Sequence, residues 1–233
     1  MTVVVMPWRD TGCPHRQASR TWVHARFAEM HPTWPIIEAA GPDGPFSRAA
    51  AILEAVEETV GRDAVVVSDT DVWCDDLTDA VEAVRRGASW AVPHGDVCRL
   101  DEDATAAVIA APDARDDRER ITLAEAPYRG HPFGGVVVLR RDMFDLVPDP
   151  RFVGWGQEDD SAAVALDTLV GPPWRGTAPL WHLWHPAPER DDRIVGNATG
   201  WSLHLRYCAA SSDPVAMRAL IEEGRRVRAS AHA

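Results

Sequence analysis

Three consecutive acidic residues, Glu158, Asp159 and Asp160, follow the glycine-rich segment Gly154–Gln157. Acids in the first turn of a helix stabilise it through the helix dipole, by ~0.3–1 kcal/mol each. One acid would serve that purpose, and three adjacent carboxylates repel one another. Beside Trp155, whose flat ring can stack on a sugar, carboxylates that accept hydrogen bonds from hydroxyl groups are typical of a carbohydrate site. The run therefore predicts a helix start that also binds a sugar.

A second pair of carboxylates, Asp69 and Asp71, directly follows the apolar run 64–68. Two acids one residue apart at the end of a strand can face the same divalent cation. Mg²⁺ and Mn²⁺ prefer such oxygen ligands and leave coordination positions free for phosphate oxygens. Asp-x-Asp also recurs in ordinary loops, so the strand that precedes it carries much of this interpretation.

His182 and His185, separated by two residues, form a third group. Two such imidazoles can converge on one metal ion, or one can bind while the other packs. The flanking Trp181 and Trp184 favour the structural alternative, a hydrophobic core with histidines at its edge. A carboxylate with imidazole would suit Mn²⁺, so the pair is a candidate partner of Asp71.

Cationic and aromatic side chains stand at two further expected strand or helix ends. Arg9 and Arg16 follow the first apolar run, and Phe46 and Arg48 precede a helical pattern. An arginine at a sheet edge can bind a diphosphate with two hydrogen bonds, and a phenylalanine can rest against a flat base. Taken alone, both segments also fit surface arginines beside a residue at a helix entry.

The elements that would position these residues alternate along the chain. Apolar runs predict strands, and helical spacing of apolar residues predicts helices. Strands are expected at 2–6, 36–37, 64–68, 90–93 and 136–139, and helices at 17–30, 46–60, 77–86, 157–169 and 213–228. Between 95 and 120 we expect helical pieces joined by a loop, least ordered at 111–119. Alternating strands and helices indicate an α/β domain, which binds ligands at the carboxyl ends of its strands.

Composition limits the classes of partner. The 233 residues favour a single domain, and the formal charge of −12 argues against nucleic acid or an anionic membrane surface. The longest apolar runs are too short to span a bilayer, and no signal-peptide pattern is evident, so a cytoplasmic location is expected. The four cysteines lie far apart without a Cys-x-x-Cys pair, so reduced thiols are expected.

Taken together, the motifs resemble a metal-dependent glycosyltransferase of GT-A fold, and most of all the β-1,4-galactosyltransferases and their bacterial relatives. The matching segments occur in the family's order and cover roughly residues 1–190, with 96–128 unmatched. They are Pro7-Trp8-Arg9 with Arg16, Phe46-Ser47-Arg48-Ala49, Asp69-Thr70-Asp71, Phe133-Gly134-Gly135 and Gly154–Asp160, in which Gln157 replaces a glycine. His182 stands where the family has Met in a Met-x-x-His pair.

The resemblance implies a Rossmann-like α/β domain with a mixed, mainly parallel sheet flanked by helices. It divides the chain into a nucleotide-sugar-binding half (1–95), an acceptor and catalytic half (128–190) and a C-terminal helical extension (191–233). It implies a Mn²⁺ or Mg²⁺ ion held by Asp71 and His185, with His182 as a further ligand. The implied donor-binding residues are Pro7, Arg9, Arg16, Phe46, Arg48, Asp69, Asp71, Gly134 and Gly135.

The implied reaction moves a sugar from a nucleotide-sugar, a UDP-sugar by the family's pattern, to a hydroxyl of a glycan, protein or small-molecule acceptor. In the family's inverting route Asp159 is the general base and Glu158 binds donor or acceptor hydroxyls. Trp155, Gly156 and Asp160 would bind the acceptor.

Three alternatives stay open. A retaining glycosyltransferase would share the fold and the metal site. A non-catalytic sugar- or nucleotide-binding module could use the same 10 Trp residues. A sugar nucleotidyltransferase is disfavoured, because the chain has neither a glycine-rich phosphate loop after its first strand nor any lysine.

Overall fold

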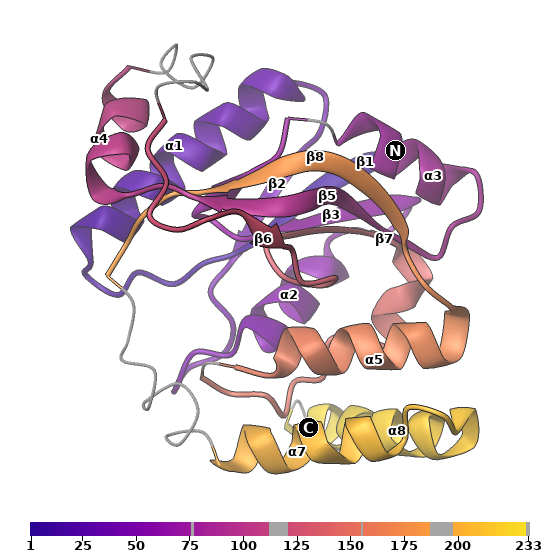
Figure 1. Cartoon of the computed structure of the whole chain (residues 1–233). Helices are drawn as coiled ribbons and strands as arrows, with labels where there is room; N and C mark the ends of the chain where they lie inside the picture. The colour runs from indigo at the N-terminus through magenta and orange to yellow at the C-terminus, as the bar shows by residue number, and fades with distance from the viewer. Residues whose placement is uncertain (76, 112–120, 155, 187–197, 232–233) are drawn as a thin grey trace.

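The computed structural model describes residues 1–75, 77–111, 121–154, 156–186 and 198–231, which form one central sheet with helices on both faces (Figure 1). The strands are β1 (Thr2–Pro7), β2 (Ile36–Ala39), β3 (Ala64–Ser68), β4 (Val72–Trp73), β5 (Trp90–Arg99), β6 (Tyr128–Arg129), β7 (Val136–Arg140) and β8 (Trp174–His182). The helices are α1 (Pro14–Met30), α2 (Arg48–Glu57), α3 (Thr78–Arg85), α4 (Glu102–Ala110), α5 (Glu158–Val170), α7 (Ala198–Ala209) and α8 (Pro214–Ala231), with a 3-10 helix η3 (Arg141–Asp145).

The strands are ordered β2-β1-β3-β7-β5-β8-β4, and β6 pairs with β5. The predicted α/β class with a mixed sheet between helices is confirmed. The expectation of a mainly parallel sheet is confirmed as well. The parallel pairs β1–β2, β1–β3 and β5–β8, with the antiparallel pairs β3–β7 and β5–β7, give β1, β2, β3, β5 and β8 one common direction. Strands β7, β4 and β6 run the opposite way.

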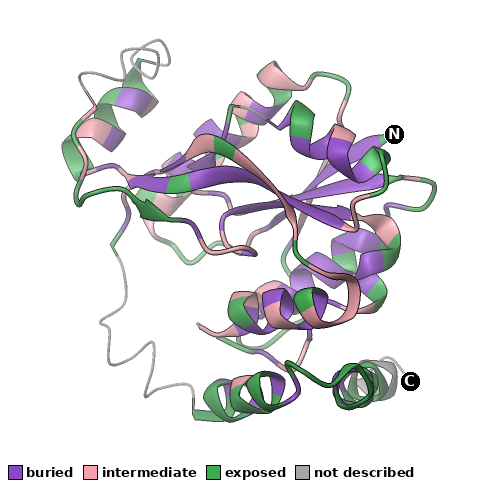
Figure 2. Cartoon of the chain, turned by 45° about the vertical axis from the view of Figure 1, so that its right-hand side comes forward, coloured by how far each residue is buried: buried purple, intermediate pink, exposed green. Residues whose placement is uncertain are grey.

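Burial on both faces of the sheet explains why these strands could be recognised in the sequence as continuous apolar runs. All six residues of β1 and all five of β3 are buried, as is most of β7 (Figure 2). Along β1, Val3 and Val5 join the hydrophobic cluster on one face of the sheet, and Val4 and Met6 join the cluster on the other. Because neighbouring residues point to opposite faces, each apolar residue fills one of the two cores.

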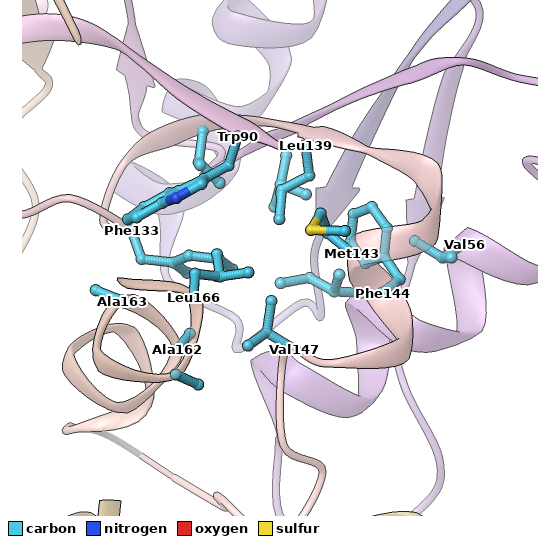
Figure 3. Close-up of a cluster of buried hydrophobic side chains, with 14 of the residues drawn as sticks. Val56, Trp90, Phe133, Leu139, Met143, Phe144, Val147, Ala162, Ala163 and Leu166 are labelled. Atoms are coloured by element: carbon cyan, nitrogen blue, oxygen red, sulfur yellow. The ribbon is translucent and has the colours of Figure 1, made fainter. Parts of the chain in front are cut away.

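The two clusters belong to two layers of helices. Side chains of α1 and α3 pack on one face of the sheet, and those of α2, α5, α7 and α8 on the other. Figure 3 shows the second cluster, in which Leu166 of α5 lies against the side chains of Phe133 and Trp90. The Trp90 indole also donates a hydrogen bond to the carbonyl of Gly171, 2.9 Å away. Helix α5, which begins with the three acids, is thereby held firmly to the sheet.

Two long elements of the structure were not expected from the sequence, strand β8 and helix α7, and neither were the short elements β4, β6 and η3. Strand β5 also extends to Arg99, well beyond the predicted 90–93, and α4 accounts for much of the stretch that follows. The segment predicted to be least ordered, 111–119, lies almost entirely outside the described residues. Within the described parts of the chain, none of the helices is both long and apolar enough to cross a membrane.

Candidate functional site

The carboxyl end of β3 carries the first pair of predicted site residues. Asp69 is fixed against the glycine pair that precedes β7, since its backbone N–H donates to the Gly135 carbonyl at 2.8 Å. The Gly135 N–H in turn donates to the Asp69 carboxylate at 3.2 Å. Gly135 has φ +76°, and a Cβ there would lie 2.4 Å from a methyl carbon of Leu180. The positive φ favours glycine at this position, and a side chain there would also displace Leu180 of β8.

Asp71 lies beside both predicted histidines. Donor atoms of Asp71, His182 and His185 all lie within 4.8 Å of one another, although the three residues come from two segments over a hundred positions apart. Strand pairing brings them together, because Val72 of β4 pairs with His182 of β8. The Leu183 N–H also donates to the Asp71 carbonyl at 2.8 Å.

The histidine hydrogen bonds show how these side chains are oriented. The Nδ1 of His182 lies 2.8 Å from the Leu183 carbonyl and that of His185 lies 3.0 Å from the Pro186 carbonyl. A carbonyl only accepts, so both Nδ1 atoms are donors and each Nε2 is the atom left to bind a cation. Metal-binding histidines are commonly held in this way by backbone carbonyls.

The Nε2 of His185 lies 3.1 Å from a carboxylate oxygen of Asp71. In the neutral imidazole with its proton on Nδ1, two lone pairs would face each other at this distance, which is unfavourable unless a proton or a metal ion is shared between them. The donor set of one carboxylate and two imidazoles fits Mn²⁺, so these residues suit the metal that the resemblance implies.

Two arginines border this group of metal-type ligands. Arg16 from the first turn of α1 lies 3.9 Å from the Asp71 carboxylate, and Arg99 at the end of β5 lies 3.3 Å from His182 Nε2. Although burial alone would raise the pKa of Asp71, the nearby imidazoles and Arg16 lower it below its usual range. Burial lowers the pKa of His182. Both shifts favour the unprotonated forms that bind a cation.

Arg48 joins the strand-end acids to the acids of α5. Its Nε lies 2.6 Å from an Asp69 oxygen, and one terminal nitrogen lies 3.0 Å from Asp159 and 3.3 Å from Glu158. The side chain is only 13% exposed. One guanidinium therefore serves three carboxylates that come from opposite halves of the chain.

Because one guanidinium contacts three carboxylates, the positive charge of Arg48 does not offset the effect of burial on the pKa values of the two acids of α5. Burial raises the pKa of Glu158 to about 8 and that of Asp159 to about 6, against the opposing charge of Arg48. Around neutral pH, Glu158 therefore keeps its proton while Asp159 is largely ionised. Two carboxylates whose pKa values are pushed apart by their surroundings can divide proton binding and proton abstraction between them.

The backbone before α5 is unusual. Gln157 precedes the first helical residue with φ 62°, and no other non-glycine residue among those described has a positive φ. Its side-chain oxygen is buried without a hydrogen-bond partner. Gly154 and Gly156 also have positive φ, at 79° and 101°. Trp155, predicted to bind the acceptor, lies outside the described residues.

The donor-side and acceptor-side segments also meet through the backbone. The Gly154 N–H donates to the Phe46 carbonyl at 2.9 Å, and the Ser47 hydroxyl donates to the Phe152 carbonyl at 2.6 Å. Gly134 likewise stands near Asp159, since a Cβ at this glycine would lie 3.5 Å from its carboxylate. Three of the sequence motifs thus converge where β3 ends.

The guanidinium of Arg9 is held by the turn that follows β2 and by the Phe46 ring. This guanidinium donates to the carbonyls of Ala40 at 2.7 Å and Gly44 at 2.6 Å, and its Cζ lies 5.5 Å from the centre of the Phe46 ring. Arg9 thus orders the turn after β2. Its guanidinium donates to backbone carbonyls of that turn, so these hydrogen bonds do not favour the predicted contact with a diphosphate. Pro7 ends β1 and pairs with Ala39 of β2, and the Trp8 N–H that follows donates to the Ala39 carbonyl at 2.9 Å.

Two side chains near the site were missed in the sequence. His131 contacts the carboxylate of Asp160, and Arg99 contacts His182. Neither stands in a recognisable motif. Arg99 reaches His182 through the pairing of β5 with β8, and His131 reaches Asp160 through the loop before Phe133. The only sequence signal near either residue is that His131 and Pro132 directly precede the Phe133-Gly134-Gly135 motif.

No protein-family model matches this chain, and no curated protein matches it. Solved structures with a similar arrangement exist at low sequence identity. One is a variant of Drosophila β-1,4-galactosyltransferase 7 in complex with manganese, UDP-Gal and xylobiose, at 16% identity and a TM-score of 0.43 over 79% of this chain and 71% of that one.

A second is glucosyl-3-phosphoglycerate synthase from Mycobacterium tuberculosis with Mn²⁺, UDP and glucosyl-3-phosphoglycerate, at 11% identity and a TM-score of 0.47 over 91% of this chain and 80% of that one. A third is the bifunctional IspDF from Campylobacter jejuni, at 14% identity and a TM-score of 0.41 over 86% of this chain and 54% of that one. The chain is structurally similar to GT-A glycosyltransferases and to this third enzyme.

Proposed function

We propose that this protein is a metal-dependent glycosyltransferase that moves a sugar from a UDP-sugar to an acceptor hydroxyl with inversion at the anomeric carbon. One observation carries the proposal. At the end of β3, Asp71 groups with His182 and His185 as metal-type ligands. Two residues before it, Asp69 contacts Arg48, which also contacts the carboxylates of Glu158 and Asp159.

On the donor side, Asp71, His182 and His185 would hold Mn²⁺ or Mg²⁺. A bound ion would neutralise the charge that develops on the departing diphosphate. Arg16, close to Asp71 at the first turn of α1, adds positive charge on the same side. The Asp69 carboxylate accepts hydrogen bonds from Arg48 and from the Gly135 N–H, which supports a role in holding Arg48 in place more than the direct donor contact the resemblance implies.

On the acceptor side, Asp159 would act as the general base. As the acceptor oxygen attacks the anomeric carbon, the Asp159 carboxylate takes the hydroxyl proton, and the bond from that carbon to the diphosphate breaks. A base works best when its pKa lies near the working pH, and the pKa of about 6 for Asp159 meets this condition. Glu158, which keeps its proton, can donate a hydrogen bond to a substrate oxygen.

Calorimetry with UDP, GDP and their common sugar conjugates, with and without Mn²⁺, tests the donor assignment. We expect one nucleotide to bind only when the metal is present. Asp71→Ala should abolish that binding because it removes a ligand, whereas Asp79→Ala removes an exposed carboxylate from α3 and should change nothing. Equal affinity in wild type and Asp71→Ala would refute the metal assignment.

The stereochemistry of the product separates the inverting route from the retaining one. An α-linked donor should yield a β-linked product, which the proton coupling constant at the anomeric carbon reports directly. A retained α-linkage would assign the chain to a retaining glycosyltransferase and remove the need for Asp159 as base. If no nucleotide binds at all, a sugar-binding module becomes the better description.

A further inference from the structure

Helix α7 runs alongside α5 in the same direction. The Ser161 hydroxyl lies 3.0 Å from His204 Nδ1, and the Thr168 hydroxyl donates to the Ser211 carbonyl at 3.0 Å. Both contacts join residues 43 positions apart, so the two segments run parallel with a constant offset in sequence. The same offset brings Trp201, in the first turn of α7, level with Glu158, the first residue of α5.

Trp201 is a large apolar side chain left partly in water. It is 43% exposed, and its ring centre lies 5.5 Å from that of His204. His204 is close enough to Asp160 to help lower the pKa of that carboxyl, after the hydrogen bond from His131. An indole that is partly in water offers a flat apolar face and a polar N–H to a ligand.

The four side chains Trp201, His204, Asp160 and His131 therefore lie around the outer edge of the acid run. They combine a flat apolar ring with imidazole and carboxylate groups that exchange hydrogen bonds with hydroxyls. This combination suits a saccharide. The carboxylates of Asp159 and Asp160 on the same edge repel a phosphorylated or carboxylated ligand, so a neutral sugar is favoured over an anionic one.

We propose that Trp201 and His204 form an outer acceptor subsite, which binds the second sugar unit of a neutral oligosaccharide whose first unit reacts beside Asp159. The indole lies against one face of this second sugar. His204, whose two ring nitrogens contact Ser161 and Cys208, packs against the indole and positions it. The subsite rests on the proposed glycosyltransferase function, and it names glycans as the acceptor class.

The experiment compares Trp201→Ala with wild type. With neutral β-linked disaccharides as acceptors, the acceptor KM should rise about three- to ten-fold, the scale of an aromatic contact of ~0.5–1.5 kcal/mol, while the donor KM stays unchanged. Trp201→Phe should recover part of the loss. Leu205→Ala serves as the matched control, because Leu205 is 51% exposed one turn further along the same helix. An unchanged acceptor KM in Trp201→Ala would overturn the subsite.

Direct binding keeps the two proposals separable. Saturation-transfer NMR with the same disaccharides and with 3-phosphoglycerate needs no turnover. Disaccharide contact that is lost in Trp201→Ala supports the subsite even if no nucleotide binds, in which case the transferase function alone has failed. Preferential binding of 3-phosphoglycerate, or disaccharide contact that survives the substitution, overturns the subsite whatever the donor experiment shows.

Discussion

A single guanidinium sets the charge balance where β3 ends. Arg48 contacts Asp69, Glu158 and Asp159, and none of these carboxylates has an equivalent cation of its own among the contacts described above. Sharing one positive charge among three acids, of which Glu158 is the buried one, leaves Glu158 protonated near neutral pH. This places the less perturbed acid, Asp159, in the ionised form that proton abstraction needs.

Asp159→Asn should preserve metal-dependent donor binding and lower kcat by about 10²–10⁴-fold, the usual loss when a general base is removed. The amide has nearly the same shape as the carboxylate, so the fold should be retained. Calorimetry for the donor and initial-rate kinetics for transfer measure the two effects separately. Near-normal turnover would move the base to Glu158 or to a retaining mechanism.

The pH profile provides an independent check. The raised pKa of about 6 means that Asp159 loses its charge as the pH falls through 6, so wild-type kcat should drop about tenfold per pH unit below that point. The residual activity of Asp159→Asn should lack this acid limb. A variant that keeps the limb would show that another group titrates.

At this scale, the sequence named Asp71 and the two histidines as one candidate group, and the structure places them together. Arg48 joins Asp69 to the acids of α5. Spacing could not reveal that Arg48 spans both halves, or that Arg9 turns to the carbonyls of the 40–44 turn. Both outcomes depend on distances between segments far apart in sequence, which a local pattern does not encode.

At the scale of elements, the start of α5 is a point of backbone strain. Gln157 occupies the left-handed region, which costs an L-residue with a Cβ roughly 1–2 kcal/mol. Gln157→Gly should therefore raise the free energy of unfolding by about 1 kcal/mol, since the relief exceeds the added flexibility of glycine in the unfolded chain. Urea denaturation followed by circular dichroism measures the change.

Gln157→Ala is the matched control for this prediction. It also removes the buried amide oxygen but keeps a Cβ, so it isolates the contribution of the backbone conformation. If alanine and glycine stabilise the protein equally, the unpaired oxygen rather than the left-handed φ is the source of the strain.

The elements themselves divide by how they are buried. Strands β1, β3 and β7 are covered on both faces and were predicted from continuous apolar runs. Strand β8 was missed, because most of its residues are only half-buried and it includes Gly176 and Pro179. Helix α7 was missed as well, because Trp201 and Leu205 remain exposed and blur its apolar stripe.

At the scale of the whole molecule, a buried ionic network attaches the last two helices. The Asp149 carboxylate accepts hydrogen bonds from Tyr207 of α7 at 2.7 Å and from Arg151 at 2.6 Å. Arg151 also donates to the Leu220 carbonyl of α8 at 2.9 Å. Asp149→Ala should cost about 3–5 kcal/mol, because it removes the buried carboxylate that pairs with Arg151 and leaves this largely buried guanidinium only the half-exposed Glu223 as an acidic partner.

Thermal and urea denaturation of Asp149→Ala measure this loss, with Tyr207→Phe for comparison. The phenylalanine variant removes one neutral donor and keeps the ion pair, so about 1 kcal/mol is expected. A loss no greater than that in Asp149→Ala would mean that apolar packing, and not the network, holds α7 and α8 in place.

Strand β3 lies between β1 and β7 in the middle of the sheet, and every one of its residues is buried. An internal strand is freed only after its neighbours separate, so Asp69, which directly follows β3, belongs to the part of the chain that opens last. The strained start of α5 and helix α7 at the periphery open earlier. Under the proposed function, a partly unfolded molecule is therefore expected to lose acceptor binding before donor binding, and to hold the nucleotide-sugar without transferring the sugar.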